Sequence, residues 1–321
     1  MAPLAGLLVV DLSRYLPGAF ATLEQWRLGA RVVRLEAPGG DPMRDTAPAW
    51  HDALNAGAES VVCDLKAEPE LGHALAARAD VVVESFRPGV VERLGIGPGD
   101  LPESVVYCSI TGFGVEGAHA QRAGHDLNYL GWAGVLADTA PGMPPVQAAD
   151  LAAGALGAVT EILAALLERE RTGRGRHIVV SMTHGSHRLA AHRLGGDPLP
   201  RLLTGGLASY GIYATADGRL LTVGALEPKF FRRLCELIGV PDLAERQYDA
   251  AAQNEIARAL ADAFAQRSLD EWLALFDGED VCVGPVATLE EASSEFGGET
   301  GLVEAPALGQ HTAEWRRELG L

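Results

Sequence analysis

The chain is poor in cysteine, in basic residues and in long apolar runs, and each shortage excludes a class of protein. Its four cysteines (Cys63, Cys108, Cys235 and Cys282) show no CxxC spacing, so we expect reduced, mostly buried thiols and no disulfide or metal site. Only 26 Lys and Arg residues oppose 43 Asp and Glu residues, and the formal net charge of −17 argues against a nucleic-acid partner. No apolar run reaches the roughly 20 residues of a membrane-spanning helix, and no signal sequence precedes the first strand-like segment. These absences predict a cytoplasmic protein without a membrane anchor.

The glycine patterns that hold nucleotide cofactors are also missing. The first strand-to-helix turn, at 13–18, lacks GxGxxG, and the glycine cluster at 95–99 contains a proline and follows no strand. There is no P-loop. We therefore expect no dinucleotide and no other cofactor, although a local basic pocket for one anionic small molecule stays compatible with the overall charge.

Short runs of branched apolar residues alternate with helical segments through the first half of the chain, which predicts an α/β fold with a parallel sheet and helices on both faces. We interpret residues 1–182 as a doubly wound, Rossmann-like large domain. The predicted strands lie at 7–12, 31–36, 60–65, 80–84, 105–110 and 177–182.

The periodicity weakens over 183–206, which we interpret as a linker between domains. Beyond it, Asp217-Gly218 between two strand-like segments predicts a hairpin, and helical segments follow. Residues 207–287 are therefore predicted to form a small α+β domain, and 288–321 to complete the large one.

Two stretches place an ionisable side chain where a loop turns into a helix: His125 and Asp126 in Ala-Gly-His-Asp-Leu-Asn-Tyr, and Asp150 in Ala-Asp-Leu. A helix N-terminus offers unpaired N–H groups and a partial positive charge. A base beside it can take a proton from carbon if those donors meet the enolate oxygen. Two bases from two helix starts would act from opposite sides, although a helix-capping role explains the same residues.

An ordered set of motifs makes the whole chain resemble the family III CoA-transferase (CaiB/BaiF) superfamily, in the branch typified by α-methylacyl-CoA racemase. No single motif is specific, but the set in this order is. The motifs are Val-Val-Arg-Leu-Glu at 32–36, Cys-Asp-Leu-Lys at 63–66, Phe-Arg-Pro-Gly-Val at 86–90, Glu-Arg-Leu-Gly at 92–95, Thr-Gly-Phe-Gly at 111–114, the stretch at 123–129, Asp150, Gly-Ala-Leu-Glu-Pro at 224–228 and Val-Gly-Pro-Val at 283–286.

The resemblance implies a catalytic role for each of the two helix starts. His125 and Asp150 would be the acid/base groups on the two faces of the α-carbon of an acyl thioester, making the protein a cofactor-independent racemase or epimerase. Glu227 would orient the His125 imidazole, and Asp126 would support the same network. No metal is implied, and CoA enters only as the carrier of the substrate.

The resemblance also implies how the substrate is held and how the chain assembles. An interlocked homodimer is expected, in which subunits thread through each other and Glu227 can come from the partner subunit. The residues expected to bind the acyl-CoA are Arg34, Lys66, Arg87, Arg93, Tyr129 and Tyr210.

Three alternatives stay open at this point. In the transferase branch, the residue at the Asp150 position attacks the thioester as a nucleophile. Glu227 would equally serve as a cap for the helix that begins at Pro228, and Arg87 and Arg93 as surface charges. Where the family usually has basic residues before the third strand, this chain has Asn-Ala-Gly-Ala-Glu at 55–59, so a non-CoA substrate or another thioester carrier is the third alternative.

Overall fold

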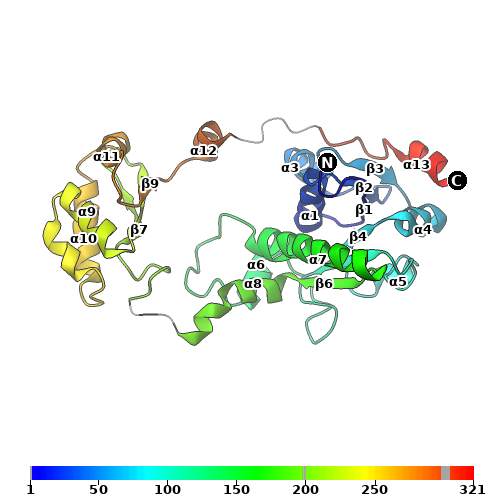
Figure 1. Cartoon of the computed structure of the whole chain (residues 1–321), viewed down its shortest axis with the longest axis horizontal. Coiled ribbons are helices and arrows are strands. Elements are labelled where there is room, and N and C mark those ends of the chain that lie inside the picture. The colour runs from blue at the N-terminus through cyan, green and yellow to red at the C-terminus, as the bar shows by residue number, and fades with distance from the viewer. Residues whose placement is uncertain (1, 197, 199, 298–303) are drawn as a thin grey trace. The chain divides into compact units, whose positions relative to one another are not determined.

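The computed structural model describes residues 2–196, 198, 200–297 and 304–321, which fall into two compact units (Figure 1). Unit 1 comprises Met1–His192 together with Gly301–Leu321, and unit 2 comprises Arg193–Thr300. Unit 1 contains a parallel six-stranded sheet and unit 2 a small antiparallel sheet. The predicted mixed α/β architecture is confirmed in this form.

The sheet of unit 1 is built from the six valine-rich runs that the sequence predicted as strands. Every neighbouring pair is parallel, and the order is β3-β2-β1-β4-β5-β6, so the direction of winding reverses between β1 and β4. Side chains on both faces are buried, as parallel sheets require. The strands are β1 (Leu8–Asp11), β2 (Arg31–Glu36), β3 (Glu59–Val62), β4 (Val81–Glu84), β5 (Val106–Thr111) and β6 (His177–Ser181).

Helices cover both faces of this sheet. On one face α1 (Leu16–Arg27), the π-helical segment η1 (Ala149–Leu156) and α7 (Gly157–Thr172) pack over the side chains of alternate strand residues. On the other, α4 (Pro69–Arg78) and α13 (Thr312–Leu319) do the same. The remaining helices of unit 1 are α2 (Met43–Thr46), α3 (Pro48–Asn55), α5 (Val90–Arg93), α6 (Asp126–Trp132) and α8 (Met182–Ala190).

Helix α8 occupies the first part of the segment predicted as a linker, and the boundary between the two units, at 192/193, lies within that segment. Its buried face uses Thr183 and Ser186, whose hydroxyl groups donate to the carbonyl oxygens of Gly112 (2.7 Å) and Met182 (2.7 Å). Small polar residues that satisfy their own hydroxyls can be buried without an apolar pattern. For that reason the periodicity did not reveal this helix.

Unit 2 contains the predicted hairpin, with Asp217-Gly218 in the turn and Gly218 at a φ of 75°. Its core gathers Phe231, Phe264 and Trp272 under the sheet. The segment predicted to complete the large domain from residue 288 does so only from 301, because α12 belongs to unit 2. The elements are β7 (Tyr210–Ala214), β8 (Leu220–Gly224), β9 (Val283–Pro285), α9 (Pro228–Ile238), α10 (Gln253–Phe264), α11 (Leu269–Phe276), α12 (Leu289–Phe296) and the short η2 (Ala191–Gly195) and η3 (Pro241–Arg246).

One expectation from composition, that of mostly buried thiols, is confirmed, and another needs correction. Cys63, Cys108 and Cys235 are buried free thiols, whereas Cys282 is exposed in the turn before β9. The continuous helix Ala149–Thr172 is long and apolar enough to cross a membrane by length and composition, although no such run was expected. This is weak evidence for a membrane, since a buried core helix passes the same test, and Ala155 and Ile162 of this helix are fully buried.

Candidate active site

The two predicted helix starts lie next to each other and are joined by one carboxylate. Helix α6 begins immediately after His125, and η1 begins at Ala149. The buried Asp126 side chain accepts, through Oδ1, the backbone N–H groups of Ala149 (2.7 Å) and Asp150 (2.9 Å). These N–H groups are therefore not free to meet an enolate oxygen, which corrects the expectation for the second helix start.

His125 and Asp150 line the same pocket, which has a volume of about 550 Å³. It opens at the carboxyl ends of β4 and β5, where parallel sheets place their ligand sites. The lining residues are Arg14, Tyr15, Pro17, Ser85, Phe86, Arg87, Pro88, Ile110, Thr111, Gly112, Ala120, Arg122, Ala123, Gly124, His125, Asn128, Tyr129, Asp150 and Met182.

Asp150 is only 9% exposed, and its environment changes its acidity. Burial, and secondly the negative charge of Asp126, raise the pKa of Asp150 from 3.8 to about 7. A carboxyl group with this pKa is present both as acid and as base at neutral pH, which is the condition for efficient proton transfer in either direction. Its position in a π-helical segment fits the frequent use of such segments at functional sites.

His125 presents an exposed imidazole at the start of α6. Its backbone N–H donates to Oδ1 of Asn128 (3.1 Å), which fixes the turn into the helix. The ring makes an edge contact with Tyr15, with the ring centroids 6.2 Å apart and the planes at 87°. The imidazole can therefore reach a substrate in the pocket while its backbone is held in place.

Tyr129, predicted to bind substrate, is a buried wall of the pocket. Its hydroxyl donates to the carbonyl oxygen of Gly124, and burial, with the charges of Asp150 and Asp126, raises its pKa to about 12. A Cβ atom on Gly112 would lie 2.5 Å from this ring, and one on Gly124 2.8 Å. Both motif glycines are thus explained by close packing against one side chain.

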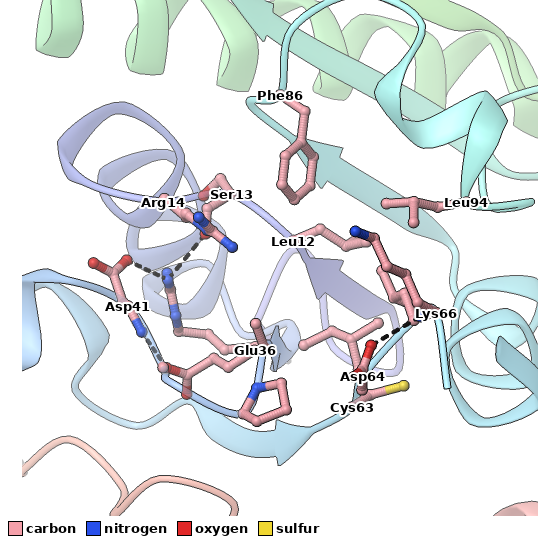
Figure 2. Close-up of a pocket in the computed structure, with 16 residues that line it drawn as sticks. Leu12, Ser13, Arg14, Glu36, Asp41, Cys63, Asp64, Lys66, Phe86 and Leu94 are labelled. Atoms are coloured by element: carbon pink, nitrogen blue, oxygen red, sulfur yellow. Dashed lines mark hydrogen bonds and ion pairs between the residues drawn. The ribbon is translucent and has the colours of Figure 1, made fainter. Parts of the chain in front are cut away.

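A second pocket, of about 310 Å³, adjoins the first at the carboxyl ends of β1, β2 and β3. Arg14 and Phe86 line both pockets. Figure 2 shows Arg14 on one side of this pocket and Lys66, which was predicted to bind substrate, on the other. Both side chains are exposed, and neither forms an ion pair with any residue that the structure describes. They are the charges that this pocket offers to an anion.

Arg34 lines the second pocket but is not available to a ligand in the way predicted. Its guanidinium is 1% exposed and forms ion pairs with Asp11 (2.8 Å) and Asp41 (2.9 Å). It also donates to the carbonyl oxygen of Ser13 (3.1 Å). Two carboxylates already neutralise this cation, so Arg34 is an internal ion-pair residue, which argues against its predicted role in binding the acyl-CoA.

The other predicted residues are distributed over both units. Arg87 is exposed on the wall of the first pocket, whereas Arg93 ends α5 outside the lining of either pocket. Glu227 and Tyr210 belong to unit 2 and are exposed. The Glu227 side chain makes no capping hydrogen bond to α9, so the alternative in which it is simply a cap is not supported. Its predicted contact with His125 stays a prediction.

Within the described ranges, no three His, Cys, Asp or Glu side chains come together as a metal ion would require. Residues 4–312 match the family model described as CoA-transferase family III. The chain belongs to CoA-transferase family III.

The most similar relatives of this family III member include both isomerases and transferases. It is 37% identical over 310 residues to the α-methylacyl-CoA racemase of Homo sapiens, across 90% of this chain and 78% of that protein. It is 32% identical over 327 residues to the succinyl-CoA:glutarate CoA-transferase of Mus musculus, across 92% and 74%. The crystal structure of a CaiB/BaiF family protein from Brucella suis matches with a TM-score of 0.85 at 28% identity, over 99% of both chains. The protein is therefore an enzyme of the family III CoA-transferase and racemase group.

Sequence reasoning missed several residues of this candidate site, above all Arg14, Tyr15 and Arg122. The turn at 13–18 has none of the known glycine patterns, and its side chains belong to no motif of the family set. The position of this turn in the sheet, and not its glycine content, indicates that it belongs to the site. A turn that follows the central strand at the point where the winding reverses faces the ligand crevice whatever its glycine content.

Proposed function

We propose that the protein is a racemase or epimerase that inverts the carbon next to the carbonyl of an acyl thioester. The observation that carries this proposal is the presence of His125 and Asp150 in one pocket, with the pKa of Asp150 at about 7. A reversible 1,1-proton transfer requires two acid/base groups at one carbon, and this imidazole and carboxyl group supply them. The identity of 37% to an α-methylacyl-CoA racemase supports the same reaction.

In the proposed reaction, one of the two groups removes the α-proton and the other returns a proton to the opposite face. For one epimer, neutral His125 accepts the proton, electrons move from the C–H bond into an enolate, and the protonated Asp150 carboxyl donates to the carbon. For the other epimer the roles are exchanged. The chemistry consumes no cofactor, and we propose none.

The enolate oxygen needs donors in the proposed mechanism. The N–H groups at the start of η1 are already bonded to Asp126. Within the described residues, the N–H groups of Asp126 and Leu127 in the first turn of α6 have no protein acceptor. We assign the enolate oxygen to this turn, beside His125.

We infer that CoA carries the acyl group, with its phosphates near Arg14 and Lys66 in the second pocket. The carboxylate of Glu59, in the segment where the family's basic residues are missing, does not line this pocket. It pairs with Arg31 (2.8 Å) and accepts from Trp315 Nε1 (2.6 Å). The added negative charge is therefore neutralised inside unit 1, which favours CoA over a non-CoA substrate.

A CoA-transferase is the second candidate, because relatives at 32% identity are transferases and Asp150 is present. That reaction requires the ionised Asp150 carboxylate to attack the thioester and form an acyl anhydride. A pKa of about 7 reduces the ionised fraction at neutral pH, and the attack leaves His125 without a role. Both points favour the racemase.

Deuterium exchange tests the proposal. The enzyme is incubated with one epimer of a 2-methylacyl-CoA in D₂O, and NMR follows loss of the α-proton and appearance of the other epimer. We expect exchange together with epimerisation, and a loss of about 10²-fold or more in His125→Ala and Asp150→Ala, since general acid–base groups contribute typically 10²–10⁴-fold. Absence of exchange in the wild-type protein would refute the racemase.

Hydroxylamine distinguishes the transferase. If an anhydride forms on Asp150, acyl-CoA plus hydroxylamine should inactivate the protein and leave a hydroxamate at Asp150 that mass spectrometry detects. For the racemase we expect neither, while exchange proceeds. Asp150→Asn, which has no carboxylate to acylate, is the matched control for the labelling.

We also propose the homodimer, for which unit 1 offers an uncovered surface. A groove of about 470 Å³ runs beside the edge strand β6 and is lined by the exposed Val179, and η1 and α7 carry further exposed apolar side chains. In such a dimer, Glu227 of the partner subunit would orient His125. Sedimentation velocity measures the state, and a monomer at micromolar concentration would contradict this. The exposed apolar residues are Leu156, Leu163, Leu167 and Val179.

A further inference from the structure

Tyr15 has a backbone conformation that aromatic residues avoid. It is one of two non-glycine residues with positive φ in the described part of the chain, at φ 63° and ψ −158°. This region is used almost only by glycine, and other residues stay in it only where their surroundings hold them there. Such outliers gather at functional sites, and Tyr15 lines the pocket of His125 and Asp150.

Side chains from three other elements hold the backbone leading to Tyr15. The N–H of Ser13 donates to Asp11 Oδ1 (2.7 Å), and that of Arg14 donates to Ser85 Oγ (3.1 Å). The N–H of Tyr15 itself donates to Asp41 Oδ2 (3.1 Å). Three consecutive residues are thus fixed by side chains instead of by regular secondary structure.

The acceptor of the Tyr15 N–H is anchored by a buried cation. Asp41 Oδ2 also accepts from Arg34 Nη2 (2.9 Å), and the two side chains are 2% and 1% exposed. The other guanidinium nitrogen, Nη1, binds Asp11 (2.8 Å), so one arginine ties together the carboxylates on both sides of the turn. An ion pair at this depth has a single defined geometry, because leaving either charge unpaired is costly.

The Tyr15 ring ends against the proposed catalytic imidazole. Its edge contact with His125 (6.2 Å between centroids, planes at 87°) is an arrangement that ring quadrupoles favour. His125 is exposed and lines the pocket, so contacts with neighbouring side chains are needed to limit rotation of its ring. Tyr15 provides such a limit.

We propose that Tyr15 is a positioning residue for His125, and that the buried Arg34–Asp41 pair holds Tyr15 in the strained conformation that the contact requires. This role rests on the proposed function, in which His125 moves a proton. The strained backbone conformation of Tyr15 costs free energy, and in this proposal it is kept because it fixes the imidazole against the α-carbon. Misplacement of a catalytic group by about 1 Å lowers rates by up to 10²-fold.

Tyr15→Gly is the decisive variant, because glycine adopts the observed φ without strain and the turn can fold as before. We expect kcat for exchange to fall about 10- to 100-fold with a smaller change in KM, since orientation and not binding is lost. Tyr15→Phe keeps the ring and should rescue kcat. If Tyr15 only helped the turn to fold, kcat would be the same in Tyr15→Gly, in Tyr15→Phe and in the wild-type protein.

An NMR resonance of His125 tests the positioning role of Tyr15 independently of whether the protein is a racemase. The imidazole C–H resonance of His125, assigned by its disappearance in His125→Gln, should carry a ring-current shift from Tyr15 in the wild-type protein. We expect Tyr15→Gly to abolish the shift, Tyr15→Phe to retain it, and Asp41→Ala to reduce it. Asp45→Ala, an exposed carboxylate four residues away, is the matched control and should leave it intact.

Two results have different meanings. If the wild-type protein shows no exchange but the His125 shift depends on Tyr15 and Asp41, the racemase proposal fails and the positioning stands. If the His125 resonance in Tyr15→Gly equals that of the wild-type protein, the positioning proposal is overturned whatever the activity.

Discussion

The environment of Asp150 affects both its proposed role in proton transfer and the free energy of unfolding. Burial and the charge of Asp126 suit the side chain to that role, and they also disfavour its ionised form. Its pKa rises from 3.8 to about 7 on folding. Between these pH values the folded protein binds the proton more tightly than the unfolded chain, so the free energy of unfolding falls as pH rises. Below about pH 4 the carboxyl is protonated in both states and the penalty is absent.

We expect Asp150→Asn to raise the free energy of unfolding at pH 8 by about 1–4 kcal/mol, because the amide has no charge to bury. At pH 4 the variant and the wild-type protein should differ little. Urea unfolding at both pH values measures this, with Asp45→Asn as an exposed control. An equal effect at pH 4 and pH 8 would show that ionisation of Asp150 is not the cause.

At the residue scale, the sequence singled out His125 and Asp150, the proposed acid/base pair, which line one pocket, but it did not predict the environments of the arginines. His125 and Asp150 are recognisable because each stands at a helix start within a specific run of neighbours. Arg34 in a strand and Arg14 in a loop are both cations in the sequence. Only the fold shows that Asp11 and Asp41 neutralise the first and that the second is exposed in the pockets.

At the scale of elements, Asp126 couples helix α6 to η1 and acts on the acidity of Asp150 through that connection. Its Oδ1 binds the first N–H groups of η1, and its charge is the second cause of the raised Asp150 pKa. The Asp126 carboxylate is thus stabilised by the positive end of η1, and the same negative charge repels the carboxylate of Asp150.

Asp126→Asn separates these two effects, because an amide oxygen accepts the same two N–H groups without the charge. We expect the ionisation of Asp150, seen in the pH dependence of the exchange rate, to move to lower pH. The helix connection should persist, so thermal unfolding should change little. A pH profile that coincides with that of the wild-type protein would contradict the assignment of Asp126 as a cause of the shift.

Helices with one apolar face were predictable, and those buried through polar groups were not. Helix α4 begins with a proline at its first position and ends with an arginine at its last, two signals of helix bounds that a sequence shows directly. Helix α8 escaped because its buried face carries hydroxyl groups bonded to carbonyl oxygens. Periodicity detects the burial of apolar area and is insensitive to polar groups that find partners inside.

At the scale of the whole molecule, α13 secures the outer strand of the sheet from nearly the far end of the sequence (Figure 1). Trp315 is fully buried, stacks under Arg31 with 4.2 Å from the guanidinium carbon to the ring centroid, and donates to Glu59 of β3 (2.6 Å). Thr312 Oγ1 accepts the N–H of Val62 (2.9 Å), so β3 is bonded on the side that faces away from β2.

Trp315→Ala is expected to lower the free energy of unfolding by about 3–5 kcal/mol, through a lost ring and a cavity under the sheet. Trp50→Ala, at a tryptophan that is 58% exposed, should change it by less than about 0.5 kcal/mol. Urea unfolding followed by circular dichroism compares them. Similar losses in both variants would show that α13 contributes little to unit 1.

The strands of the sheet were predictable from their valine-rich runs, and the C-terminal segment was expected to complete the domain, but the order of the strands and the contacts of that segment were not predictable. Pattern shows which residues are buried and leaves open which distant segment buries them. The segment after residue 297 has little periodicity in the sequence, and a single helix of eight residues with one buried tryptophan supplies the closing contacts.

The return of the chain to unit 1 at residue 301 sets an order for its biosynthesis. As the chain leaves the ribosome, all six strands and the whole of unit 2 emerge before residues 304–321 can bind β3. During this interval the edge of the sheet is open to pairing with other nascent chains. A chaperone that shields β3 until the last helix is synthesised would therefore protect this protein. The benefit would be smaller for a protein whose edge strand is covered by segments that lie close to it in the sequence.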